Sequence, residues 1–174
     1  MDDVLVTGDV TNIVLCDQDS DVRIYKLTIK LQAKNIGARA VIISAADAMA
    51  DFYKFANTVE ALNAKQYAHI GWVTSGSQGD PKTVPADPAK PFRVVAPNGS
   101  IDINVDFRAI VVDELKPGHI YVQVVAENWP DYSDDYVRKI RRSWNKVGNL
   151  WAHSLHSGPI AFVMPANLKQ IRCP

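Results

Sequence analysis

The fold is decided by one stretch in which apolar and polar residues alternate, Tyr25-Lys26-Leu27-Thr28-Ile29-Lys30-Leu31-Gln32-Ala33-Lys34. The alternation recurs in a second stretch, Ile101-Asp102-Ile103-Asn104-Val105-Asp106-Phe107-Arg108-Ala109. A period of two is typical of a strand with one buried face and one solvated face, as in an antiparallel sheet that covers a core. We therefore expect the apolar residues of both strands to face one shared core, because a slip of one residue would bury lysines or aspartates.

The composition describes an ordinary globular chain. Its 174 residues are 47% hydrophobic and 22% charged, and we expect residues 1–174 to form a single domain. Nineteen basic and nineteen acidic residues cancel, so no global field favours nucleic acid or an anionic membrane. No apolar run is long enough for a transmembrane helix, and the first residues lack the pattern of a signal peptide.

The chain has two cysteines, Cys16 and Cys173. Two unpaired thiols are the simpler interpretation of such sparse cysteine usage. The alternative is a disulfide that joins the first strand to the tail, which would indicate an oxidising, extracellular or periplasmic compartment. The compartment stays open at this stage.

The remaining segments predict a mainly β protein. Strands are expected at about 4–15, 22–34, 39–43, 67–74, 92–96, 101–109, 119–127 and 160–164. The first of these reads as one or two short strands broken at Gly8-Asp9. We expect 22–34 and 39–43 to pair as a hairpin, and 92–96 and 101–109 to pair around Pro97-Asn98-Gly99-Ser100. The proline- and glycine-rich segment Ser75–Pro91 is expected to be an exposed loop.

Two helices are predicted within this β pattern. Ser44 and Asp47 resemble a capping box, and helical spacing relates the apolar residues Met49, Phe52, Tyr53, Ala56, Val59 and Leu62. These features predict a helix over about 45–63. Ser133 can cap a second helix over about 134–147, whose first turn is acidic and whose apolar stripe contains Ile140 and Trp144.

One segment resembles a known family, Leu115-Lys116-Pro117-Gly118-His119-Ile120-Tyr121-Val122-Gln123-Val124-Val125-Ala126-Glu127-Asn128. It is similar to the sixth-strand region of fibronectin type III and related immunoglobulin-like domains, where a Leu-x-Pro-Gly turn precedes a tyrosine that ties the corner to the backbone. Lys34-Asn35-Ile36-Gly37 also resembles the Asn-x-Gly bend of bacterial adhesion-related sandwich domains. The resemblance implies an immunoglobulin-like antiparallel β-sandwich with two added helices. The predicted second strand lacks the family's tryptophan, and the fold implies no particular activity.

No catalytic or cofactor-binding constellation is recognisable. The serine-rich turns contain neither a Gly-x-Ser-x-Gly elbow nor a phosphate-binding loop. Hard oxygen ligands for calcium could come from the acidic run Asp17, Asp19 and Asp21. An EF-hand would require glycine and an acidic residue where Val22 and Thr28 stand, so a solvated acidic turn is favoured and calcium stays open.

Histidines offer no better metal site. His153 and His156 are close in sequence, but zinc would need further ligands at suitable spacing. Ordinary surface histidines are therefore the favoured interpretation. We predict no catalytic residue, no metal site and no cofactor.

The most suggestive surface is the aromatic and basic tail at 129–151. Trp129, Tyr132 and Trp151 are expected to be its binding aromatic residues, and Arg138 and Arg142 its binding cations. Flat aromatic faces suit sugar rings, and mixed aromatic and basic surfaces suit lipid headgroups or proteins. The alternative is that the aromatic residues are core and the basic residues a solvated helix face.

These features predict a non-catalytic module that binds a macromolecular partner, with a protein favoured, through the loop 75–91 and the tail 129–151. A carbohydrate- or lipid-binding sandwich, such as a lectin or a membrane-active toxin, is the second hypothesis. A hydrolase whose site is not recognisable from sequence is the third. Joint exposure of the three tail aromatic residues would favour the second hypothesis. The sequence does not indicate the oligomeric state.

Overall fold

Strands dominate the chain, and two short helices complete it. The computed structural model describes residues 3–16, 23–64, 69–72, 80–89, 92–111, 117–130 and 132–172. The elements in chain order are β1 (Val4–Cys16), β2 (Arg23–Asn35), β3 (Val41–Ser44), β4 (Met49–Ala56), α1 (Val59–Asn63), β5 (His69–Trp72), β6 (Phe92–Val95), β7 (Ser100–Val111), β8 (Gly118–Glu127), α2 (Asp134–Trp144), β9 (Asn149–Leu150), β10 (Leu155–His156), β11 (Ile160–Met164) and β12 (Gln170–Ile171).

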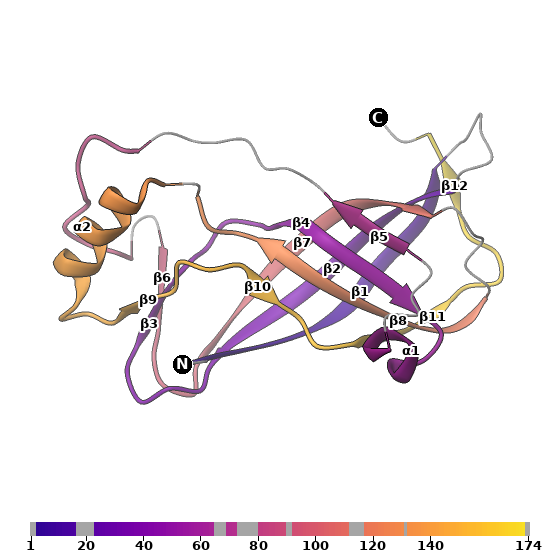
Figure 1. Cartoon of the computed structure of the whole chain (residues 1–174), viewed down its shortest axis with the longest axis horizontal. Coiled ribbons are helices and arrows are strands. Elements are labelled where there is room, and N and C mark those ends of the chain that lie inside the picture. Colours follow the sequence, from indigo (N-terminus) through magenta and orange to yellow (C-terminus); the bar gives the residue numbers. More distant parts are fainter. Residues whose placement is uncertain are drawn as a thin grey trace.

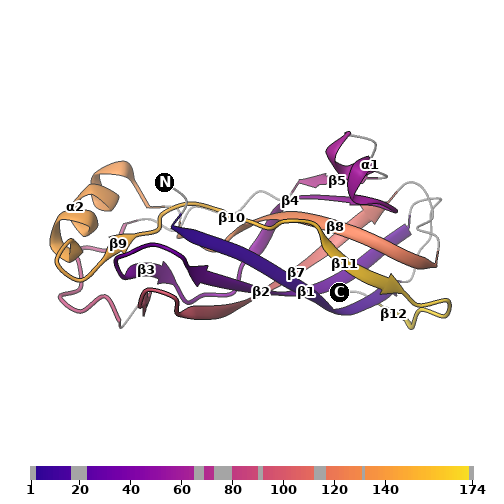
Figure 2. The same cartoon turned by 90° about the horizontal axis from the view of Figure 1, so that it is seen from below.

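The strands form three open sheets. The β2 sheet has the order β12-β1-β2-β7, and the β8 sheet has the order β10-β8-β4-β5 with β11 also paired to β8. The end sheet has the order β6-β3-β9. Figure 2 shows the β2 and β8 sheets as two layers, with the end sheet and α2 at one end of an elongated molecule. The prediction of a mainly β protein is confirmed.

The main core lies between these two layers. The predicted inward residues of β2 and β7 are buried in it or, for Ile101, packed against it. They meet buried residues of β4 and β8 such as Phe55, Val122 and Val124. The two alternating strands pair antiparallel over their whole length, with Leu27 opposite Phe107 and Leu31 opposite Ile103. The expectation of one shared core is therefore confirmed.

The predicted helix over 45–63 is wrong. Residues 49–56 form the strand β4, which lies between β8 and β5 (Figure 1), and only Val59–Asn63 is helical. The burial of Ala50, Tyr53 and Phe55 follows the strand, while Met49 is exposed. Aromatic residues favour strands, and backbone pairing on both sides outweighs the helical spacing. The cap of the short helix is Thr58, whose Oγ1 accepts from the N–H of Ala61 at 3.1 Å.

Both predicted hairpins are also wrong, although the turns are present. β3 pairs with β6 and β9, whereas β2 pairs with β1 and β7. The turn before β7 has Asn98 at φ 64° and a bond from the N–H of Gly99 to the carbonyl of Ala96 at 2.9 Å. The chain therefore reverses at the predicted positions, but the strands on either side of each turn enter different sheets.

Other expected elements agree with the structure. α2 covers Asp134–Trp144 of the predicted 134–147, with Ser133 as its N-cap. β11 has the predicted bounds Ile160–Met164, and β1 is one continuous strand rather than two broken at Gly8. Neither described helix is long and apolar enough to cross a membrane.

The cysteine prediction needs a correction. Cys16, at the end of β1, is engaged in a disulfide, so the interpretation of two unpaired thiols is wrong. The other cysteine of the chain, Cys173, lies outside the described residues. The acidic run at 17–21 also lies outside them.

The buried face of β7 gives a stability prediction. Ile103 is 2% exposed, so Ile103→Ala should lower the free energy of unfolding by about 2–5 kcal/mol. Gln32→Ala, on the solvated face of β2, should change it by no more than about half a kcal/mol. Urea denaturation of the two variants measures both values. Equal small losses would show that this face is not core.

Candidate functional site

The two segments that were expected to bind a partner meet at one end of the molecule. Residues 80–89, the described part of the predicted loop, lie against α2. We call the end sheet, α2, residues 80–89, residues 129–130 and residues 132–133 the end lobe. A second hydrophobic cluster, separate from the main core, holds it together.

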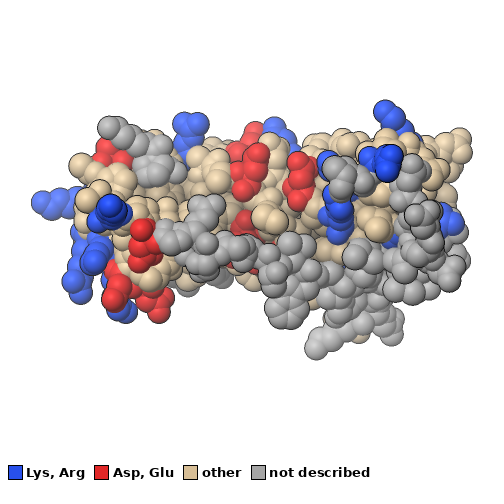
Figure 3. Space-filling view, turned by 90° about the horizontal axis from the view of Figure 1, so that it is seen from above, with Lys and Arg blue, Asp and Glu red and all other residues tan. Residues whose placement is uncertain are grey.

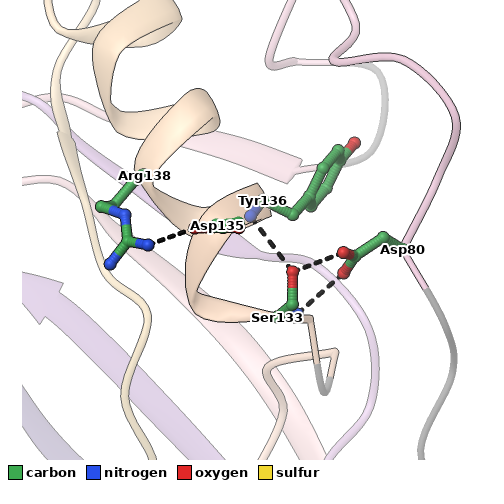
Figure 4. Close-up of polar contacts among 5 residues, drawn as sticks. All are labelled: Asp80, Ser133, Asp135, Tyr136 and Arg138. Atoms are coloured by element: carbon green, nitrogen blue, oxygen red, sulfur yellow. Dashed lines mark hydrogen bonds and ion pairs between the residues drawn. The ribbon is translucent and has the colours of Figure 1, made fainter.

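Asp80 fixes the start of α2. Its carboxylate accepts from the backbone N–H of Ser133 at 2.7 Å and from the Ser133 hydroxyl. The same hydroxyl accepts from the N–H of Tyr136 at 3.2 Å and so caps the helix (Figure 4). The hydrogen bonds from Ser133 lower the pKa of Asp80 below its usual value. A single carboxylate thus joins the loop to the helix.

Two further hydrogen bonds fasten the loop to the buried side of α2. The Tyr136 hydroxyl donates to the carbonyl of Thr83 at 3.1 Å, and the indole N–H of Trp144 donates to the carbonyl of Pro85 at 2.8 Å. Burial raises the pKa of Tyr136 above its usual value. Since the apolar stripe Tyr136, Ile140 and Trp144 is buried, the helix is mounted firmly and cannot offer that stripe to a partner.

Trp129 and Tyr132 belong to an aromatic stack inside the end lobe. Trp129 stacks on Phe92 with ring centroids 5.3 Å apart, and Tyr132 contacts Trp129 at 5.7 Å and Tyr136 at 4.9 Å. Both residues are half-buried. Each residue therefore keeps part of its surface accessible.

Trp151 lies elsewhere. It packs against the main core, its backbone N–H donates to the carbonyl of Ile42 at 2.9 Å, and its ring contacts His153 at 5.6 Å. Its indole nitrogen is buried without a hydrogen-bond partner among the described residues. The three tail aromatic residues are all half-buried and belong to two clusters, so they do not form one exposed platform.

The basic residues of α2 point outward. Arg138 and Arg142 are one turn apart, and at about 100° per residue they lie opposite the buried stripe. Lys139 and Arg141 flank them, and all four are exposed. Arg138 pairs with Asp135, whereas Arg142 has no ion pair among the described residues. Figure 3 shows Lys and Arg side chains projecting from this end of the molecule.

One polar group was not foreseen from the sequence. Asp51 sits where the β4–β8 register shifts between Ala50 and Phe52, and its carboxyl lies close to that of Glu127. Glu127 also accepts from Ser154 Oγ at 3.1 Å and from the N–H of Trp129 at 3.2 Å. Burial raises the pKa of Asp51. No sequence pattern links carboxylates that are so far apart in the chain.

The histidine pair and the surface hollow are weaker candidates for a binding site. His153 and His156 are both exposed, and the described residues contain no group of three or more metal-ligating side chains. A hollow of about 270 Å³ lies at the other end of the molecule, beside Tyr25 and Leu168. It falls below the roughly 300–1,000 Å³ of typical ligand pockets.

Comparison of the chain with protein-family models, with curated proteins and with solved structures gave no match. Any statement about its function therefore rests on the geometry described above.

The mounting of α2 predicts a clear ranking of two variants. Trp144→Ala removes a ring that is 1% exposed and should cost about 3–5 kcal/mol of unfolding free energy. Arg141→Ala should stay within about half a kcal/mol. Chemical denaturation followed by far-UV circular dichroism compares the two, and the reverse ranking would contradict the assignment of the buried face.

Asp51 predicts a pH dependence. Because its pKa is raised in the folded state, its contribution to stability is greatest below its usual pKa and is lost as the pH rises through the raised value. Asp51→Asn should therefore raise the melting temperature at pH 7, and the gain should shrink toward pH 4. Asp9→Asn, on the exposed side of β1, should give no such gain. A gain that is independent of pH would argue against a desolvated carboxylate.

Proposed function

We propose that this chain is an immunoglobulin-like β-sandwich that acts as a non-catalytic binding module, and that its end lobe recognises an acidic segment of a protein partner. The observation that carries the proposal is the outward basic face of α2 on a firmly mounted helix. The whole chain has no net charge, whereas residues 132–148 contain five basic and two acidic residues. Concentrated charge of one sign steers and orients a partner of the opposite sign.

The fixed geometry of the lobe supports recognition rather than a merely solvated helix. Its cap, the loop contacts and the aromatic stack hold Arg138 and Arg142 in place before any partner arrives. A binding surface that is already ordered loses less conformational entropy on association. The accessible parts of Trp129 and Tyr132 add aromatic area of the kind that is enriched in protein interfaces.

The disulfide at Cys16 supports an oxidising compartment, either extracellular or periplasmic. In such a compartment the partner would be another exported protein or a surface protein. The proposal requires no metal or cofactor.

A carbohydrate ligand is the second candidate, and one observation favours it. Asp51, Glu127 and Ser154 form a polar group next to the backbone of Trp129. Carboxylates and a hydroxyl that lie close together can form hydrogen bonds with the hydroxyls of a sugar. The division of the tail aromatic residues between two clusters favours the protein over the sugar.

The proposal is tested by fluorescence anisotropy with labelled peptides rich in Asp and Glu that contain one or two aromatic residues. The double variant Arg138→Glu/Arg142→Glu should weaken binding at least about tenfold, because the loss of even one hot-spot residue costs about 2 kcal/mol or more. The matched control Lys169→Glu/Arg172→Glu makes the same charge change at exposed positions near β12, at the opposite end (Figure 1). It should bind like the wild type.

Three outcomes would count against the proposal. The acidic peptides could bind no more tightly than basic peptides of equal length, or both double variants could lose the same affinity. Titration of glycans could change the tryptophan fluorescence while the acidic peptides show no binding, which would favour the carbohydrate candidate. A chelator should have no effect on the binding of the acidic peptides.

A further inference from the structure

Within the part of the chain that the structure describes, β1 leaves a long edge of the β2 sheet without a backbone partner. Only its last two residues, Leu15 and Cys16, pair with β12. From Val4 to Val10 the strand pairs with β2 alone. A strand edge of this length is a template on which another extended chain can add.

The hydrogen bonds at the start of β1 show which of its backbone groups point outward. The carbonyl of Asp3 accepts from the N–H of Ile36 at 2.8 Å, so Asp3 points toward the β2 side. Asn35, which lies opposite Val4, donates instead to Gly99 on the other side of β2. The direction of the backbone groups alternates along a strand, so the N–H and C=O groups of every second residue point away from β2. These residues are Val4, Val6, Gly8 and Val10. Their outward groups have no backbone partner among the described residues.

One residue of the neighbouring strand β11, Ile160, lies beneath this edge. A Cβ at Gly8 would approach Leu31 to 2.7 Å and Ile160 to 3.1 Å. A Cβ stands perpendicular to the sheet, and Leu31 is a core residue, so Ile160 lies under the inner face of Gly8. Natural sheets commonly protect such edges with lysine or proline. This edge has neither between Val4 and Val10. Its one charged residue there is the exposed Asp9, and a register shift follows Val10, while Leu5 is 49% exposed on its outer face.

We propose that a second copy of this chain covers the edge, with the two β1 strands antiparallel and Thr7 on the two-fold axis. In this register Val4 lies opposite the partner copy's Val10, and Val6 lies opposite the partner copy's Gly8. Every outward backbone group from Val4 to Val10 of both strands then finds a partner. A two-fold contact of identical edges is the closed arrangement that most homodimers adopt.

The side chains fit the same register. Thr7 meets its own copy, a favourable cross-strand pair, and Leu5 lies opposite the partner copy's Asp9. A slip that put Asp9 on the axis would oppose two carboxylates. Edge pairing alone buries less than the roughly 1,200–2,000 Å² of stable interfaces, so we expect a weak dimer that forms at high protein concentration.

Cysteine trapping tests the proposal. Thr7 would form a non-hydrogen-bonded pair with Cα atoms about 4.5 Å apart, which lies within the disulfide range of about 4.4–6.8 Å. At about 200 µM protein, a dimer with a Kd of about 1 mM is populated in part, and mild oxidation of Thr7→Cys should trap it as a covalent dimer. The control is Thr11→Cys, which is exposed on the same strand. It should cross-link at least about tenfold more slowly, because Thr11 lies away from the two-fold axis and a strand rises about 3.3 Å per residue, so its two copies are far apart.

Sedimentation velocity gives an independent readout. The wild type should show a sedimentation coefficient that rises with concentration. Thr7→Lys should remain monomeric with an unchanged melting temperature, because two like charges would meet at the axis. A wild type that stays monomeric throughout, or a Thr7→Cys rate equal to that of Thr11→Cys, would overturn the proposal. Faster cross-linking through Leu5→Cys would overturn the register. Neither result depends on the basic residues of α2, so failure here is separate from failure of the binding proposal.

Discussion

The complete burial of one face of β2 is the constraint on which the rest of the structure depends. Leu27, Ile29 and Leu31 have no exposed surface, and β2 is paired along its whole length with β1 on one side and β7 on the other. Because the strand can neither slip nor turn over without burying lysines, it fixes the register of both neighbours. It also fixes where the β8 sheet must lie to cover the apolar face.

Asn35, at the end of β2, connects this strand to the end lobe through its side chain. Its amide nitrogen donates to the carbonyls of Arg39 and Val95, both at 2.9 Å, and its oxygen accepts from the N–H of Gly37 at 2.9 Å. The residue is 1% exposed, so these bonds are not replaced by water. They hold the turn into β3 and the end of β6 against β2. The buried Asn35 side chain therefore helps to orient the lobe that carries α2 relative to β2.

Sequence patterns predicted the parts of this molecule that are governed by local periodicity. The alternation of β2 and β7, the cap at Ser133 and the outward position of Arg138 and Arg142 all follow from spacing along one element. β4 was missed because its apolar residues fit either a strand or a helix, and only pairing with β8 and β5 decides between them. The division of Trp151 from Trp129, and the meeting of Asp51 with Glu127, depend on long-range packing that no spacing records.

The charges of the chain are distributed so that the end lobe differs from the rest of the surface. On the solvated face of the β2 sheet, lysines and aspartates of adjacent strands offset one another, as in the Lys30–Asp102 pair at 2.8 Å. On α2, Asp135 offsets Arg138, while Arg142 lacks an ion-pair partner among the described residues. The two proposed contacts therefore rest on different physics. Salt screens the attraction of an exposed basic helix for an acidic partner, whereas the backbone bonds of a β1 pair are not ionic and should be far less sensitive to it. In this proposal, the end lobe selects a partner and the edge of the β2 sheet pairs with a second copy of the chain. The two contacts use different residues and do not compete.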